Sequence, residues 1–300
     1  MIKATRSADG LAANVICSGV AIYLDTFAII RLAKGDPSRR QRFVAAVHSK
    51  ADLIFSVANA AELIGPQKDS LEAVKNFLNE IGAHWFPVEL DTFEVVARER
   101  NGAQPSKSCL SPRFVQDFAS AQFADQPLPT AGEVISLGDD FFRLGRVLDW
   151  LVPQRASILE GNRKFDEVLA QTVDRYRGEF DRDPQWLDRY TPALSFNPSI
   201  PATFVHANLL RTLVKAKGSQ SQLKKGDGLD FSHAVMGSAF ANIAALDKAW
   251  KARVESLPQP NGLARIYYEP ELDAMVSDIE NHVRALEAAE KSQLAKGARP

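Results

Sequence analysis

Four acidic residues stand where carboxylates could bind a metal ion together. Asp25 and Asp247 each follow directly after a short apolar run, Glu62 comes shortly after another, and Asp230 begins a helical pattern. Hard cations such as Mg²⁺ and Mn²⁺ prefer carboxylate oxygens, and they relieve the repulsion among clustered acids. Such a site suits the hydrolysis of phosphodiester bonds, because one ion activates water while a second stabilises the leaving oxygen.

The strands and helices that would position these acids can be read from the apolar pattern. Residues 20–24, 53–57 and 84–88 are predicted strands, and helical spacing follows each of them. Strands that alternate with helices predict a parallel, doubly wound sheet, whose ligand sites lie at the carboxyl ends of the strands. Asp25 comes directly after the first strand, and Glu62 lies on the helix after the second, which Asn59 is expected to cap. These acids are therefore expected at one sheet edge.

The middle of the chain follows a different pattern. Residues 101–132 contain four prolines and predict a long irregular connection. Apolar stripes over 137–151 and 165–180 predict two helices, and Pro201 opens a third. The alternation of helices and strands returns after Gly226, with short strands expected at 243–246 and 264–268 and a helix beginning at Asp230.

The simplest organisation of residues 1–300 is one discontinuous α/β domain. We expect the domain to comprise about 14–104 and 199–290, with a mostly helical insertion at about 105–198. The C-terminal residues from Lys291 are expected to fray.

The composition narrows the class of protein. Hydrophobic residues make up 45% of the 300 residues and charged residues 24%, the balance of a soluble globular protein. Cys17 and Cys109 are too few for a disulfide framework, and residues 1–13 lack the pattern of a signal peptide, so we expect a cytoplasmic protein with no membrane partner. No glycine-rich phosphate loop or nucleophile elbow occurs, so the sequence indicates neither a nucleotide cofactor nor a serine hydrolase.

Two basic stretches flank the acids. Positive side chains beside a negative metal centre would suit a phosphate backbone, although most charge runs are solvated faces. The predicted nucleic-acid-binding residues are Arg31, Lys34, Arg39, Arg40 and Arg42 after the first strand, and Arg211, Lys215, Lys217, Lys224 and Lys225 before Asp227.

Four segments of the sequence, residues 22–26, 56–63, 226–234 and 244–248, together resemble PIN domains. PIN domains are metal-dependent ribonucleases that include toxins of bacterial toxin–antitoxin pairs. The resemblance covers roughly residues 18–100 and 200–285, and it implies a PIN-like three-layer α/β/α fold with a central parallel sheet. It further implies an endoribonuclease that acts on RNA through a Mg²⁺ or Mn²⁺ site, whose ligands would be Asp25, Glu62, Asp230 and Asp247.

Further residues are expected around this site. Asp227 is a fifth metal ligand or a turn aspartate, and His233 either assists the carboxylates or is a core histidine satisfied by hydrogen bonds. Thr26 and Ser56 are expected auxiliary residues. Phe27 stands where PIN domains usually carry a small polar residue that could orient the first aspartate, which bears on activity more than on fold.

Each acid also has a structural interpretation. Asp25 and Asp230 could be helix N-caps, Glu62 a first-turn acid favoured by the helix dipole, and Asp247 the partner of Lys248. Their joint placement at one sheet edge favours a shared site. A second hypothesis is a PIN-like scaffold that binds nucleic acid or a protein without catalysis. In a third, the insertion is a dimerisation or partner-docking arm.

Overall fold

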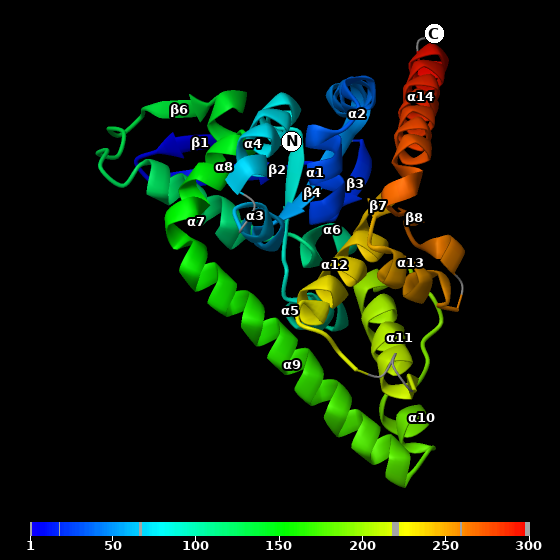
Figure 1. Ribbon diagram of the computed structural model, residues 1–300. Helices are drawn as coiled ribbons and strands as arrows, with labels where there is room; N and C mark the ends of the chain where they lie inside the picture. Colours follow the sequence, from blue (N-terminus) through cyan, green and yellow to red (C-terminus); the bar gives the residue numbers. More distant parts are fainter. Residues whose placement is uncertain (1, 18, 66–67, 218–221, 259, 298–300) are drawn as a thin grey trace.

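The computed structural model describes residues 2–17, 19–65, 68–217, 222–258 and 260–297. Its central element is a sheet of five parallel strands in the order β5-β4-β3-β7-β8 (Figure 1). These strands are β3 (Val20–Leu24), β4 (Ala51–Ser56), β5 (Trp85–Val88), β7 (Ile243–Ala245) and β8 (Arg265–Tyr267). The central strands β3 and β4 are buried along their whole length, which explains their continuous apolar runs. The predicted parallel α/β sheet is confirmed.

The strand order creates a switch point beside β3. The chain first adds β4 and β5 on one side of β3, and it later returns to place β7 and β8 on the other side. Leu24 at the end of β3 is paired with Ala245 at the end of β7. In open α/β sheets the crevice at such a reversal, outside the carboxyl ends of the strands, is the usual place of a ligand site.

Helices cover both faces of the sheet. Alternate side chains of β3 point to opposite faces, so that Ile22 and Leu24 join one hydrophobic cluster and Ala21 and Tyr23 join the other. The first cluster includes residues of α1 (Thr26–Lys34), α2 (Pro37–Lys50), α3 (Val57–Leu63), α4 (Lys68–Ile81), α8 (Leu144–Leu151) and α14 (Leu272–Gly297). The second includes residues of α5 (Thr92–Arg100), α9 (Arg155–Arg182), α11 (Pro201–Lys215), α12 (Asp227–Phe240) and α13 (Lys248–Glu255).

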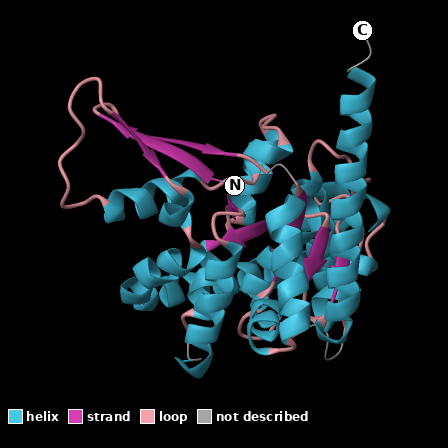
Figure 2. Ribbon diagram, turned by 90° about the horizontal axis from the view of Figure 1, so that it is seen from above, coloured by secondary structure: helices cyan, strands magenta, loops and turns pink. Residues whose placement is uncertain are grey.

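A second, three-stranded antiparallel sheet was not predicted. The N-terminal strands β1 (Ile2–Ser7) and β2 (Gly10–Val15) form a hairpin, and β6 (Val134–Leu137) pairs with β1. Figure 2 shows this sheet apart from the parallel one. β6 lies within residues 105–198, the segment that we expected to be a mostly helical insertion. Through β6, this segment pairs with the first strand of the chain.

The middle of the chain also differs in detail from the prediction. Residues 101–132 are not wholly irregular, since they contain α6 (Pro105–Ser108) and α7 (Pro112–Gln122). The stripe over 137–151 is not one helix: Leu137 ends β6, and a short 3-10 turn separates it from α8. The long helix α9 and then α10 (Trp186–Tyr190) lead to α11 (Figure 1).

Two helix boundaries differ from those expected. α12 begins at Asp227 and not at Asp230, and α14 continues to Gly297, so the expected fraying from Lys291 is wrong. Within the ranges that the structure describes, no helix has both the length and the apolar character needed to cross a bilayer.

Candidate metal centre

Asp25 and Asp247 lie side by side at the switch point of the sheet. Asp25 follows β3 and is the N-cap of α1, where its Oδ1 accepts a hydrogen bond of 2.6 Å from the Thr26 amide. Asp247 follows β7 closely and is the N-cap of α13, with Oδ1 2.7 Å from the Trp250 amide nitrogen. The N-cap interpretation of Asp25 is thus correct, but a cap uses only part of a carboxylate's acceptor capacity. Both residues keep an oxygen for a ligand.

Glu62 is carried to the same edge by helix α3. Ser56 is the N-cap of this helix, and its hydroxyl accepts a hydrogen bond from the Asn59 amide in a capping box, so the expected cap at Asn59 is wrong. The Asn59 side chain instead donates to the Leu24 carbonyl over 3.2 Å, which ties α3 to the end of β3. The Thr26 hydroxyl then donates to Oε2 of Glu62. Ser56 and Thr26 therefore both help to position Glu62.

Helix α12 contributes His233 and Asp230. His233 is 1% exposed, with Nε2 3.4 Å from Oε2 of Glu62, and its Nδ1 is hydrogen-bonded to the Tyr23 hydroxyl. Tyr23 can approach α12 this closely only because residue 237 is glycine: a Cβ there would lie 2.7 Å from the Tyr23 ring. The central strand thus orients the imidazole toward the carboxylates.

Ligand atoms of Asp25, Glu62 and His233 all lie within 4.8 Å of one another. Two carboxylates and one imidazole at this spacing could hold a single metal ion. The carboxylates suit Mg²⁺ or Mn²⁺, whereas the imidazole also suits transition metals, so this donor set does not by itself select the ion. The sequence suggested His233 only as an auxiliary residue; its spacing of three from Asp230 was the one signal available.

The pKa values show that Asp230 and Asp247 belong to the same electrostatic cluster. Burial raises the pKa of Asp25 to about 6 and that of Asp230 to about 7, and each is raised further by the other nearby carboxylates, Asp247 among them. We call Asp25, Glu62, Asp230, Asp247 and His233 the acidic cluster. Burial and the neighbouring carboxylates both disfavour the ionised forms of Asp25 and Asp230, and a bound cation would offset both effects.

His233 offsets part of this charge. Burial opposes its protonation, but the neighbouring carboxylates of Glu62, Asp25 and Asp230 prevail and raise its pKa to about 9. Burial likewise opposes ionisation of Glu62, yet the interactions with His233 and Thr26 hold the pKa of Glu62 below its usual value. At neutral pH the two groups form an ion pair, in which the imidazole is buried and the carboxylate is partly exposed.

The long helix α9 fixes the start of α12. Both oxygens of Asp166 accept backbone hydrogen bonds of 2.9 Å, one from the Gly226 amide and the other from the Gly228 amide. A Cβ at position 228 would lie 2.5 Å from backbone atoms of Phe165 and Asp166 in α9. The insertion therefore supports the helix that carries Asp230 and His233.

Asp227 is the first residue of α12, directly after the turn, and is not among the group of close potential ligand atoms formed by Asp25, Glu62 and His233. Its Oδ2 accepts a hydrogen bond of 2.6 Å from the Lys224 amide. It lines a hollow with Asp166 and Arg163 of α9. This arrangement corresponds to the turn aspartate of the two interpretations that the sequence left open.

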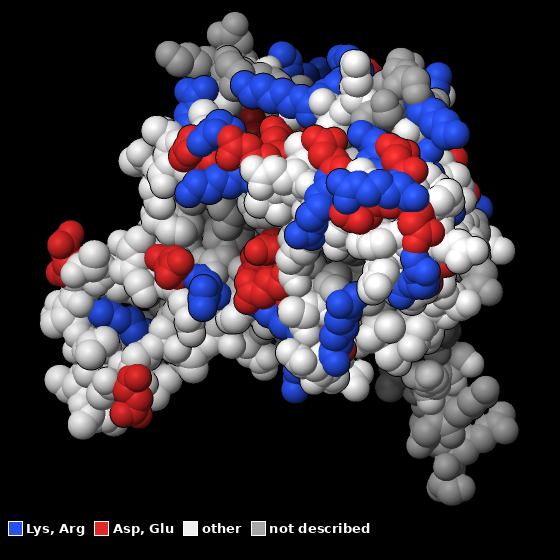
Figure 3. All heavy atoms as spheres, turned by 90° about the horizontal axis from the view of Figure 1, so that it is seen from below, with Lys and Arg blue, Asp and Glu red and all other residues white. Residues whose placement is uncertain are grey.

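All five predicted nucleic-acid-binding arginines are paired with acids. Arg40 and Arg42 each contact one carboxylate through two guanidinium nitrogens, on Glu80 and Glu280 respectively. The remaining pairs are Arg31–Glu269, Arg39–Asp273 and Arg211–Asp188. Figure 3 shows basic and acidic side chains interleaved on one face of the molecule. These arginines hold helices together, and binding of a phosphate backbone by them stays a prediction.

The predicted lysines differ from the arginines. Lys34 donates to the Ser70 hydroxyl over 3.0 Å, whereas Lys215, Lys224 and Lys225 are exposed. Lys224 and Lys225 directly precede the start of α12, near the acidic cluster. They line the same hollow as Asp227 and Arg163.

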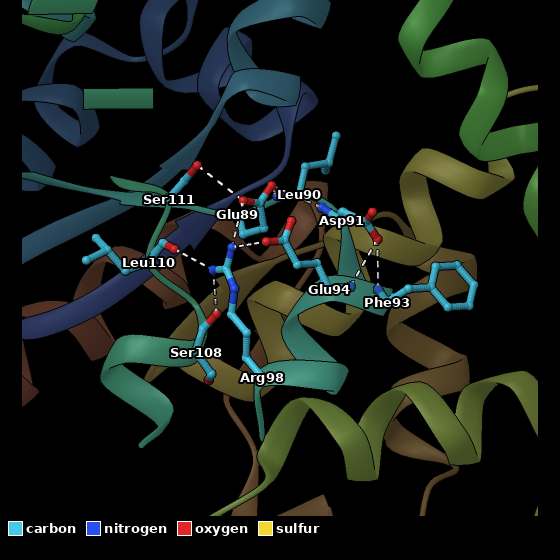
Figure 4. A network of polar contacts seen from close by, with 9 residues as sticks. All are labelled: Glu89, Leu90, Asp91, Phe93, Glu94, Arg98, Ser108, Leu110 and Ser111. Atoms are coloured by element: carbon cyan, nitrogen blue, oxygen red, sulfur yellow. Dashed lines mark hydrogen bonds and ion pairs between the residues drawn. The ribbon is translucent and has the colours of Figure 1, made fainter. Parts of the chain in front are cut away.

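A neighbouring acid is held by a network of polar contacts (Figure 4). Glu89 directly follows β5, at the same edge of the sheet. Its carboxylate is 3.6 Å from the Arg98 guanidinium, and it accepts hydrogen bonds from the Ser111 hydroxyl and the Leu90 amide. Arg98 also pairs with Glu94, so one guanidinium serves two carboxylates.

Comparisons of this chain with protein-family models, with curated proteins and with solved structures give no match. Its function has therefore to be inferred from the site itself.

Phe27, at the position where PIN domains usually carry a small polar residue, is partly buried and packs against the hydrophobic core. It thus has a structural role beside Asp25.

Proposed function

We propose that this protein is a divalent-metal-dependent, PIN-like endonuclease that hydrolyses phosphodiester bonds in RNA. The observation that carries the proposal is the convergence of Asp25, Glu62 and His233 within 4.8 Å at the switch point of a parallel sheet. Asp230 and Asp247 add negative charge to the same place: Asp247 is among the carboxylates that raise the pKa of Asp25, and both Asp25 and Asp247 raise the pKa of Asp230. The preference for RNA and for Mg²⁺ or Mn²⁺ derives from the resemblance to PIN domains.

Each residue of the cluster has a role in this proposal. Asp25 and Glu62 would hold the ion, and Thr26 keeps the Glu62 carboxylate oriented through its hydroxyl. A bound Mg²⁺ or Mn²⁺ would supply an activated water and charge stabilisation at the phosphate. Asp230, with a pKa raised to about 7, can exchange a proton with water near neutral pH. His233 would release its proton to solvent when the ion binds and offer Nε2 as a third ligand, because only a neutral imidazole binds a metal ion.

Cleavage of single-stranded RNA in the presence of Mn²⁺ tests the proposal. Asp25→Asn should abolish cleavage while keeping the fold, because asparagine caps a helix as well as aspartate does. Asp36→Asn is the matched control, since Asp36 caps α2 away from the cluster. Equal RNA cleavage by the wild type and Asp25→Asn would exclude this site as a nuclease centre, and cleavage of DNA alone would overturn the assignment to RNA.

A second candidate is a PIN-like scaffold that binds a nucleic acid or a protein without catalysis. The ion pair between His233 and Glu62 favours it, because it neutralises part of the cluster without a metal. Calorimetric titration with Mn²⁺ separates the two functions. Binding at one site that Asp25→Asn removes supports the nuclease, whereas no binding supports the scaffold.

A further inference from the structure

A large pocket lies against the parallel sheet, and none of the residues of the acidic cluster lines it. Its volume is about 800 Å³. Ala21, Ile54 and Phe86 of the three strands β3, β4 and β5 line it on the face that α11 and α12 cover, together with Ala239 and Phe240 at the end of α12. Asp230 and His233 lie toward the other end of that helix, so the pocket is separate from the candidate metal centre.

The remaining walls come from segments outside the parallel sheet. Strand β2 contributes Leu11, Ala13 and Val15, and α7 contributes Val115. Ile16, which follows β2, also lines the pocket although 44% of its surface is exposed. The pocket is therefore concave, mostly apolar and partly formed by the N-terminal hairpin. Its volume lies within the range of about 300–1,000 Å³ of small-molecule sites.

Lys107 of α6 is the single charged residue among those described as lining the pocket. Its side chain is exposed, and no acid shares the wall with it. The polar atoms of Asn14, Ser106 and Gln116 also line the pocket. One cation beside an apolar cavity matches a ligand that combines an apolar body with one negative charge.

Cys17 and Cys109 contribute apolar surface and not reactive thiolates. Cys17 is an exposed residue, but partial desolvation and the Asp52 carboxylate raise the pKa of its thiol to about 11, and burial raises the pKa of Cys109 to about 12. Both thiols are therefore neutral at physiological pH, and neutral cysteine behaves as a small hydrophobic residue. Lys107 is therefore the charged residue of the pocket wall that would select the polar headgroup of a ligand.

We propose that this pocket binds an aliphatic carboxylate, with its hydrocarbon chain in the apolar cavity and its carboxylate at Lys107. The inference is independent of the proposed nuclease activity, because it uses none of the residues of the acidic cluster. The apolar walls gain contacts and lose exposure to water when a hydrocarbon fills the cavity. The lysine ammonium supplies the complementary charge for the carboxylate.

Calorimetric titration of the full chain with decanoate tests the proposal. We expect binding of one decanoate, and binding of 1-decanol and decylamine that is weaker than that of decanoate. Lys107→Met, which keeps the apolar stem of the side chain, should weaken decanoate binding about threefold to tenfold. Lys164→Met on the exposed face of α9 is the matched control and should leave binding unchanged.

A pair of substitutions on one strand locates the ligand. Ala13→Trp places a large ring into the pocket from β2 and should abolish binding, whereas Ala12→Trp places the same ring on the other face of that strand. Absence of decanoate binding to the wild type, or equal binding by the Ala13→Trp and Ala12→Trp variants, would overturn the site. Equal affinity for decanoate and decylamine would overturn the assignment of a carboxylate ligand.

Discussion

Nε2 of His233 lies 3.4 Å from Oε2 of Glu62, although the two residues come from helices far apart in the sequence. The imidazole is held in this position by Tyr23, whose hydroxyl is hydrogen-bonded to Nδ1. This pair joins α12 to α3 across the end of the central strand β3. It makes His233 part of the acidic cluster, and the charges of this cluster should make the stability of the protein depend on pH.

Replacing Asp230 by asparagine should stabilise the metal-free protein at pH 8 but not at pH 5. The folded-state pKa of Asp230 is raised to about 7, so the folded state binds more protons than the unfolded state between about pH 4 and 7. Stability therefore falls as pH rises through this window, and Asp230→Asn removes that loss. Urea unfolding at both pH values measures it, with Asp125→Asn at an exposed site as control. An equal gain at pH 5 and pH 8 would contradict the raised pKa of Asp230.

His233 should give a pH dependence of the same sign in a higher window. Its folded-state pKa is raised from 6.5 to about 9, so its contribution to stability is fully present below pH 6.5 and is lost as pH rises through 9. The wild type should lose stability between these values more steeply than His233→Asn does. The slopes of the unfolding free energy against pH provide the comparison, and identical slopes would show that the histidine is neutral in the folded protein.

The hydroxyl group of Thr26 should support the binding of Mn²⁺. Thr26→Val keeps the shape of the side chain but removes the donor to Glu62, and we expect the affinity for Mn²⁺ to fall by about tenfold. Thr26→Ser restores the hydroxyl and should restore most of the affinity. Calorimetric titration measures the three proteins. Tight Mn²⁺ binding by Thr26→Val would mean that Glu62 needs no such support.

The contact between the insertion and α12 depends on a glycine. In Gly228→Ala the added Cβ would meet the α9 backbone at 2.5 Å, and we expect a loss of about 1–3 kcal/mol in stability. Gly161→Ala within α9 is the control: its Cβ would meet no atom within 4 Å, and the helix should gain about 0.5–1 kcal/mol. Chemical denaturation compares both variants with the wild type. Similar stabilities of the two variants would mean that α9 does not pack tightly on α12.

Substitutions of Arg211 and of the exposed lysines should have different effects: the first should lower stability, and the second should affect RNA binding. Arg211 is buried, and it donates to the carbonyls of Leu187 and Thr191 and to Asp188, so Arg211→Gln should cost about 1.5–3 kcal/mol. Replacing Lys224 and Lys225 by glutamine should leave stability unchanged.

The same two lysines should instead affect RNA binding. Their loss should reduce the slope of log affinity against log salt concentration by about 0.7 for each lysine that contacts phosphate. Fluorescence anisotropy with labelled single-stranded RNA at several salt concentrations measures this slope. A slope that stays the same in the double variant would place the RNA elsewhere.

The parallel sheet and the positions of Asp25 and Glu62 could be predicted from local patterns. Continuous apolar runs predict strands buried on both faces, and β3, β4 and β5 lie where these runs are. Because the carboxyl ends of parallel strands share one edge, the residues that follow them converge wherever the strands are adjacent.

Only the tertiary structure decided the rest, because it depends on contacts between distant segments. The pairing of β1 with β6 could not be predicted from the residues of either strand, because it depends on contacts between two segments far apart in the sequence. The same holds for Asp166, which binds the start of α12, and for the arginines, whose acids lie on other helices. His233 lies in the acidic cluster because its imidazole is hydrogen-bonded to Tyr23, and the Tyr23 ring fits against α12 only because residue 237 is glycine. The sequence alone thus determined which acids reach the sheet edge, and packing determined which charges there remain uncompensated.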